Sequence, residues 1–262
     1  MDHASVRDLY DLEMRRDARP DGPDGRIERV GNVVRHTGPP LGWNGVVWSD
    51  LDEATADRAI AEQIAHYDGL EGGRTWEWKL YDHDLPADLG ARLRAAGFEP
   101  EDPETLMVAE VAALAVDAAP PEGVRLVPVT DASGVGLMMA VHDRAFGGPP
   151  RPDLHRQLLD QVTGAPGTVA AVVAMAGDEP VSAARLEMPP GARFAGLWGG
   201  GTVEEWRGRG IYRALVAHRA RIAAAHGIPY LQVDASDQSR PILERLGFAP
   251  LGVTVPYVRQ AR

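Results

Sequence analysis

The sequence has no cysteine, and this absence excludes disulfide bonds, thiolate zinc sites and a cysteine nucleophile. It has no run of 18 apolar residues and no basic leader followed by an apolar stretch, so neither a membrane span nor a signal peptide is predicted. We therefore expect a cytoplasmic protein that uses no metal. Lysine is also scarce, since Lys79 is the only one, a bias that we attribute to genome base composition.

Acidic residues are concentrated in the first part of the chain. Residues 1–120 hold 12 Arg and Lys against 25 Asp and Glu, a net charge of −13, whereas residues 121–262 hold 15 against 13, a net charge of +2. Binding a phosphate backbone needs clustered cations, so we expect no nucleic acid partner. A cationic acceptor such as an amine suits the acidic part, although ordinary surface charge is the simpler explanation. At 262 residues the chain is long enough for two domains.

The most informative segment is Arg207-Gly208-Arg209-Gly210, which lies between a predicted strand at 193–198 and a predicted helix. The helix is indicated by apolar spacing on one face and ends before Gly227 and Pro229. A helix N-terminus offers free backbone N–H groups and the positive end of the helix dipole, and glycines let an anion approach the backbone. The segment therefore predicts a site for a pyrophosphate.

This loop is neither of the two commonest phosphate loops. No lysine follows it, which excludes G-x-x-x-x-G-K-[ST], and Arg213 stands where G-x-G-x-x-G needs its last glycine. It resembles the acyl-CoA loop R/Q-x-x-G-x-G/A of the GNAT acyltransferase superfamily, with Arg207 and Gly210 in place and Tyr212 as a departure. A second GNAT-like motif follows, a strand at 230–233 and a short helix ending in Leu246-Gly247-Phe248. The resemblance runs from about Pro121 to the C-terminus.

The resemblance implies an acetyl-CoA-dependent N-acetyltransferase that moves the acetyl group directly to a small-molecule or peptide amine. In the family two neighbouring strands diverge and the pantetheine arm inserts between them. Carried over position by position, the acetyl-CoA contacts are Gly200, Gly201, Thr202, Arg207, Gly208, Arg209, Gly210, Ile211, Tyr212, Arg213, Ser236 and Ser239. The glycines at 200 and 201 also predict a bulge or turn.

A faint internal repeat suggests that the first part of the chain has the same fold. Residues 93–100 match residues 243–250 at Leu, Gly, Phe and Pro, and in both places a predicted strand precedes a short helix. Chance similarity of two α/β units is the alternative. In place of the glycine loop the first part has the acidic segment 49–53, which we read as a helix N-cap that repels anions.

We therefore expect an α/β (α+β) fold of two GNAT-like units, each a mixed sheet with helices on both faces, with the CoA loop only in the second. The expected domains are 1–118, a degenerate GNAT-like unit, and 119–262, the N-acetyltransferase domain, joined through the proline-containing segment 117–123.

Three family positions are altered, and they leave the catalytic groups open. Ser236 replaces the usual Asn, Ser239 replaces a small Ala, and Leu243 replaces a Tyr that often protonates the leaving thiolate. Glu187 at a strand end is a candidate base and Tyr257 in the last strand a candidate acid, although a solvated hairpin residue and ordinary packing explain them as well. Residues His142, Asp143 and Trp198 and the irregular segment 145–152 are candidates for the acceptor pocket.

Two further readings stay open. The loss of the tyrosine at Leu243 is compatible with a non-catalytic acyl-CoA-binding or sensor module, and the donor is either acetyl-CoA or a longer acyl-CoA. The acceptor amine is not specified by the sequence, and we expect a monomer or homodimer without a membrane partner.

Overall fold

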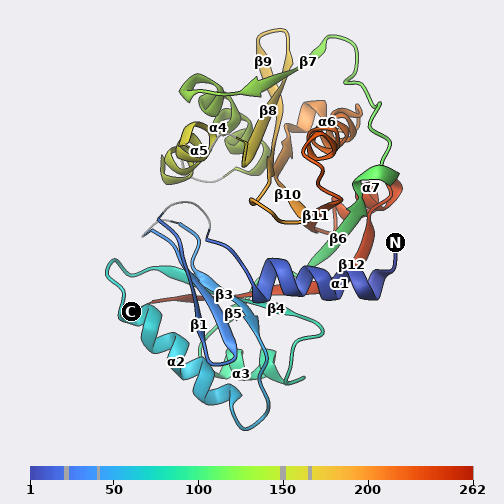
Figure 1. Cartoon of the computed structure of the whole chain (residues 1–262). Coiled ribbons are helices and arrows are strands. Elements are labelled where there is room, and N and C mark those ends of the chain that lie inside the picture. Colours follow the sequence, from blue (N-terminus) through green and yellow to red (C-terminus); the bar gives the residue numbers. More distant parts are fainter. Residues whose placement is uncertain (21–23, 40–41, 148–151, 165–166, 262) are drawn as a thin grey trace. The chain divides into compact units, whose positions relative to one another are not determined.

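The computed structural model describes residues 1–20, 24–39, 42–147, 152–164 and 167–261 (Figure 1). The chain forms two compact units that are not contiguous segments. The first holds residues 1–107, 234–241 and 250–262, and the second holds residues 108–233 and 242–249. The domain division expected after residue 118 differs from this one, because the last strand of the chain pairs inside the first unit.

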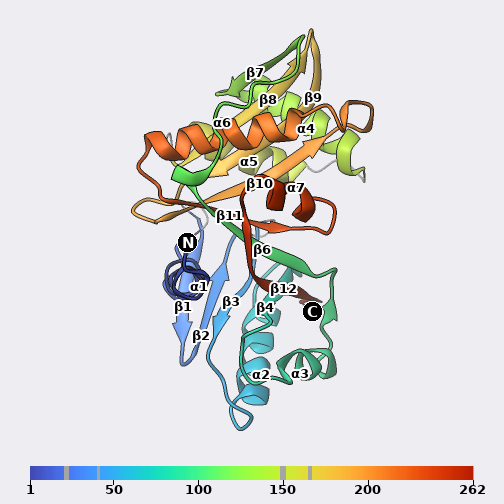
Figure 2. The same cartoon turned by 90° about the vertical axis from the view of Figure 1, so that its right-hand side faces the viewer.

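The first unit contains a mixed sheet with strand order β1-β2-β3-β4-β12. Strands β3 and β4 are parallel, whereas β1–β2, β2–β3 and β4–β12 are antiparallel. Helices α2 and α3 lie on one face of this sheet and α1 on the other (Figure 2). The elements are α1 (His3–Tyr10), a π-helix (Asp11–Arg16), β1 (Arg26–Val30), β2 (Val33–Thr37), β3 (Gly45–Ser49), α2 (Ala56–Asp68), β4 (Thr75–Tyr81), α3 (Leu89–Ala95), β5 (Glu99–Pro100) and β12 (Ala249–Gln260).

Strand β4 separates an apolar interior from a polar one. Trp76 and Trp78 are each 1% exposed and pack with α2 and α3. The ring of Trp76 stacks on Tyr67 at 4.2 Å and meets Phe98 edge-on at 4.9 Å. Because side chains alternate along a strand, Glu77, Lys79 and Tyr81 point to the opposite face, toward α1.

On that polar face the only lysine of the chain, Lys79, is partly buried and forms an ion pair with Asp234. Burial alone would lower the pKa of Lys79, but attraction to Asp234 and Tyr10 raises it above its ordinary value. The hydroxyls of Tyr10 and Tyr81 lie 3.2 Å apart, and burial raises the pKa of Tyr10 to about 12. Burial together with the charge of Asp234 raises the pKa of Glu104 to about 7.

The second unit contains a mixed sheet with strand order β6-β11-β10-β9-β8-β7. Strands β7 to β10 pair antiparallel, and β10–β11 is parallel. Strand β6 begins in the first unit and ends in the second. Strand β11 begins in the second unit and ends in the first. The elements are β6 (Glu104–Glu110), a 3-10 turn (Val111–Ala113), β7 (Val124–Val129), α4 (Ala132–Phe146), α5 (Pro152–Gly164), β8 (Val169–Ala176), β9 (Glu179–Glu187), β10 (Phe194–Thr202), a 3-10 turn (Glu204–Trp206), α6 (Ile211–Ala225), β11 (Tyr230–Ala235) and α7 (Arg240–Arg245).

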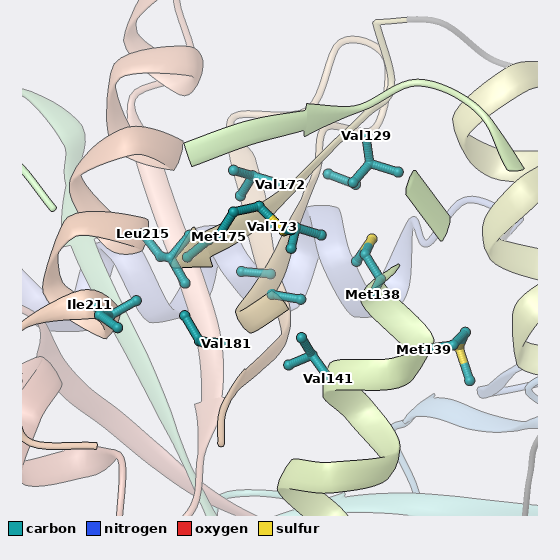
Figure 3. Close-up of a cluster of buried hydrophobic side chains, with 14 of the residues drawn as sticks. Val129, Met138, Met139, Val141, Val172, Val173, Met175, Val181, Ile211 and Leu215 are labelled. Carbon is teal, nitrogen blue, oxygen red and sulfur yellow. The ribbon is translucent and has the colours of Figure 1, made fainter. Parts of the chain in front are cut away.

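Helices α4 and α5 cover one face of this sheet and α6 the other (Figure 1). Figure 3 shows Ile211 and Leu215 of α6 on one side of Val173, with Met138 of α4 on the other. Helix α4 begins where the Asp131 carboxylate accepts the backbone N–H of Gly134 at 2.9 Å. The apolar side chains of α4 and α6 therefore cover the sheet from both faces.

The predicted strands and helices are present, with two bounds shifted. The short helix predicted to end in Leu246-Gly247-Phe248 ends at Arg245. The helix predicted from about residue 53 begins at Ala56. Asp52 is responsible, because its carboxylate accepts the N–H groups of Ala54 and Thr55 at 3.0 and 2.8 Å and so builds a turn ahead of the helix. In the part of the chain that the structure describes, no helix is long and apolar enough to cross a membrane.

The raised pKa of Glu104 predicts a stability that falls between about pH 4.5 and pH 7. Over this range the folded chain keeps the Glu104 proton while the unfolded chain releases it, so the free energy of unfolding decreases as pH rises. Glu104→Gln should remove this decrease, and its advantage over the wild type should grow from pH 4.5 to pH 7 in urea titrations. The exposed Glu99→Gln is the control and should follow the wild-type curve. Parallel curves for Glu104→Gln and wild type would contradict the assignment.

Candidate active site

The parallel strands β10 and β11 stay together for only part of their length. They pair from Phe194 opposite Tyr230 to Gly196 opposite Gln232, although β10 runs on to Thr202. A side chain at position 196 would collide with the indole nitrogen of Trp198 and approach the Gln232 amide within 2.8 Å. Beyond Gly196 the strands diverge, as the family resemblance implies for the strands that receive pantetheine.

A bulge in β10 lies directly beyond the divergence. Between Trp198 and Gly201 this strand has two residues where β9 has one, and Gly199 has a φ of 59°. This is the arrangement of a β-bulge with glycine in the left-handed region. A Cβ on Gly201 would lie 2.8 Å from the ring of Phe146, so the end of α4 packs against the bulge because position 201 has no side chain. The predicted bulge is confirmed.

The glycine loop leads into the N-terminus of α6. Gly208 and Gly210 have φ values of 75° and 83°, a conformation that other residues rarely adopt. Gly210 is the N-cap and offers no side chain, and the first helical hydrogen bond runs from the Ala214 N–H to its carbonyl at 3.1 Å. The N–H groups of residues 211–213 have no acceptor within the helix and point outward with the positive dipole end. This geometry fits a phosphate group.

The arginines of the loop have different tasks. Arg207 donates through Nε to the Thr202 carbonyl at 3.0 Å and through Nη2 to the Ala145 carbonyl at 3.2 Å, so it ties the loop to β10 and α4. Arg209 lies over the ring of Trp206 at 4.6 Å, and Arg209 and Arg213 are exposed. An anion at the helix end would therefore meet the positive charge of these two side chains together with the helix dipole.

Tyr212 closes the loop against β10. Its ring lies 3.2 Å from the place where Gly200 would carry a Cβ, and burial raises its pKa. The tyrosine that departs from the family pattern thus packs on the small residue of the bulge.

A small pocket lies between α4, α5 and the bulge, and we call it the α4 pocket. His142 contributes its ring, 5.2 Å from that of Phe146, and its Nδ1 is buried without a hydrogen-bond partner. Asp143 Oδ1 is 3.5 Å from that nitrogen, but Asp143 is exposed and not part of the lining. The pocket is otherwise mostly apolar and is lined by Met138, Met139, Val141, His142, Phe146, Leu154, Leu158, Ala183, Arg185, Gly199 and Gly201.

The candidate base Glu187 is held by Arg185, whose Nε donates to its Oε1 at 2.6 Å. Arg185 was not singled out from the sequence, and only its position opposite Trp198 across β9 and β10 relates it to the site. Trp198 is half-buried beside Gly196. Of the irregular segment 145–152, residues 148–151 lie outside the described residues.

Three predicted residues belong to the first unit. Ser236 and Ser239 are in the turn before α7, with their hydroxyls 3.3 Å apart. Tyr257 is 4% exposed in the aromatic core, opposite Trp78 on β4 and in contact with Gly90. Its packing explains its presence in the last strand, and its role as an acid stays a prediction.

The first unit has a similar strand divergence, but its own chain fills it. Strands β3 and β4 pair only at Gly45–Glu77 and Val46–Trp78. The next carbonyl of β3, that of Val47, accepts Arg15 Nε at 3.1 Å. The Arg15 guanidinium is 3% exposed, lies 4.0 Å from the Tyr81 ring centroid and makes two bonds to Asp84 at 2.8 and 2.6 Å. This unit therefore binds its own arginine beside the point where its parallel strand pairing ends.

Residues 138–248 match the sequence model of the Acetyltransferase (GNAT) family. This segment is a GNAT acetyltransferase domain. It includes β10, the glycine loop, α6 and β11. A search of curated protein sequences finds no match.

Solved structures resemble the chain over most of its length. One is a GCN5-related N-acetyltransferase from Kribbella flavida, with 19% identity, a TM-score of 0.66 and 88% of each chain covered. Another is a functionally unknown conserved protein from Staphylococcus epidermidis, with 17% identity, a TM-score of 0.72, and 94% of this chain and 97% of that chain covered. A tandem GNAT protein from the clavulanic acid biosynthesis pathway has 14% identity, a TM-score of 0.60, and coverage of 93% and 85%.

At these identities the similarity shows the fold. Because the alignments extend through both units, the first unit is GNAT-like as well, and the tandem arrangement predicted from the repeat is confirmed.

The buried contact of Arg15 with Asp84 predicts a large loss of stability when one partner is removed. Arg15→Met leaves the carboxylate, 5% exposed, without its cation and should cost about 3–5 kcal/mol in chemical denaturation. Arg15→Met combined with Asp84→Asn removes both charges and should recover most of that loss. The neighbouring exposed Arg16→Met, as control, should change stability by less than about 0.5 kcal/mol. If Arg15→Met cost no more stability than the control, the buried contact of Arg15 with Asp84 would not stabilise the first unit as described.

Proposed function

We propose that the chain is an acetyl-CoA-dependent N-acetyltransferase that moves the acetyl group directly to a small-molecule or peptide amine. The observation that carries this proposal is the sequence of three features along one stretch of chain. Parallel strands diverge after Gly196, a bulge follows, and two glycines with positive φ then open the N-terminus of α6. Together they provide two sites for an elongated ligand: backbone groups of β10 at one end and an anion site at the other.

In this proposal the pyrophosphate of acetyl-CoA accepts hydrogen bonds from the backbone N–H groups of residues 211–213. The side chains of Arg209 and Arg213 add positive charge nearby. The pantetheine arm follows β10 beyond Gly196. The Gly201 carbonyl already accepts the Ser182 hydroxyl at 2.7 Å and the Thr202 carbonyl accepts Arg207, so the exposed backbone of Gly200 is the most open contact.

The reaction forms a C–N bond as the neutral amine attacks the thioester carbonyl, and the C–S bond breaks. The amine loses a proton and the CoA thiolate gains one. Leu243 is fully buried and cannot donate that proton, so another group or water supplies it.

The buried Leu243 also favours one alternative, a module that binds acyl-CoA without turnover, and a longer acyl donor is a second. The cytoplasmic location and the monomer or homodimer state stay predictions. A screen separates the alternatives: acetyl-CoA and longer acyl-CoAs are offered with spermidine, tobramycin, lysine or a short peptide, and thiol release is recorded. The absence of cysteine removes protein background from that readout. Binding without release by any amine supports the non-catalytic module.

Gly210→Glu should abolish acetyl-CoA binding measured by calorimetry. The added carboxylate lies at the helix N-terminus, where it repels the pyrophosphate and removes charge-assisted hydrogen bonds of about 1.5–3 kcal/mol each. Gly177→Glu is a matched control, because Gly177 also has a positive φ, lies in the same unit and has open space around it. Retained affinity in a folded Gly210→Glu protein, or equal loss in the control, would sink the assignment.

Direct transfer predicts intersecting double-reciprocal plots when amine and acetyl-CoA are varied. The rate should rise with pH as the acceptor amine loses its proton. Mass spectrometry of enzyme mixed with acetyl-CoA alone should find no acetylated residue. Parallel plots together with an acetyl-enzyme would instead establish a covalent route.

A further inference from the structure

The α4 pocket contains an imidazole, that of His142, which makes no hydrogen bond to a described residue. His142 lies on α4 one turn before Phe146, and its ring is half-buried among apolar side chains. Its Nδ1 is buried without a hydrogen-bond partner, and no described residue bonds its Nε2. A buried polar nitrogen without a partner is uncommon in proteins and calls for a reason.

The position of the ring relates it to the diverging strands. Gly199 and Gly201 of the bulge line the same pocket as His142. The bulge is where our proposed function places the pantetheine arm, so the imidazole lies beside the proposed position of the thioester.

The other titratable candidate on this face is already engaged. The Glu187 carboxylate accepts a short bond from Arg185, and the guanidinium of Arg185 also approaches the bulge, 3.3 Å from where Gly199 would carry a Cβ. Arg185 thus orients Glu187 along the strand, whereas His142 lines the pocket and its Nδ1 makes no hydrogen bond.

We propose that His142 is the base that accepts the proton of the acceptor amine. This inference rests on the proposed function and changes its chemistry by moving the base from Glu187 to His142. As the C–N bond forms and the C–S bond breaks, the amine proton passes to the imidazole, and the thiolate leaves with its electron pair and is protonated from solvent. Asp143, 3.5 Å from Nδ1, stabilises the imidazolium that results.

The proposal predicts a selective loss of turnover. With the amine that gives the fastest thiol release in the screen, His142→Gln should lower kcat about 100-fold or more, the usual size of general-base assistance. Its calorimetric affinity for acetyl-CoA should stay within about twofold of the wild type, because the pocket does not include the glycine loop. His142→Ala should be rescued in part by added imidazole, which a merely structural histidine would not show.

Two controls accompany these variants. His218→Gln removes another half-buried histidine of the same unit, on α6 and outside the α4 pocket, and should leave kcat unchanged. Glu187→Gln tests the rival base directly and should lower kcat much less than His142→Gln.

The outcomes separate the two proposals. If the wild type turns over and His142→Gln does the same, or if Glu187→Gln alone is inactive, the histidine assignment is overturned while the proposed function stands. If the wild type binds acetyl-CoA but no amine releases thiol, the proposed function falls and the base assignment falls with it.

Discussion

A parallel strand pair that stops pairing partway leaves backbone groups that need other partners, and this requirement organises both units. Buried N–H and C=O groups are costly to leave unpaired, so each divergence has to be filled by chain, water or ligand. In the second unit the bulge at Gly199 maintains the divergence, because it adds one residue to β10 and turns the strand while its pairing with β9 continues. Arg207 then fixes the strand end by holding the Thr202 carbonyl.

The two units meet the same requirement in different ways. In the first, Arg15 donates to the Val47 carbonyl and is itself neutralised by Asp84 and Asp11, so the opening is closed by a charge network. In the second, glycines occupy positions where side chains would fill the space, and the helix N-terminus beyond them carries no capping side chain. One tandem fold thus holds a divergence satisfied from within and another suited to an external ligand.

Features that depend on neighbouring residues could be predicted from the sequence. Glycines at 208 and 210 predicted a turn into a helix, and apolar spacing predicted α6, because both signals lie within a few residues. Contacts between distant residues were not predictable. Nothing near Arg15 indicates that it bonds Val47 and Asp84, and the pairing of β12 with β4 joins segments more than 150 residues apart. Arg207 shows the same limit. The motif predicts that it contacts acetyl-CoA, and the sequence gives no sign that its side chain donates to the Thr202 and Ala145 carbonyls.

The place of the C-terminal strand also affects the order in which the chain can fold. Strand β4, with Trp76 and Trp78, pairs with β12, and the Lys79 ammonium pairs with Asp234. During synthesis residues 1–107 leave the ribosome before residues 234–260, so for that time the first unit lacks this strand and this counter-ion. Until β12 is made, the edge of β4 that it covers stays unpaired, and Lys79 lacks the carboxylate of Asp234 on β11. The segments of the first unit are therefore synthesised on either side of the second unit.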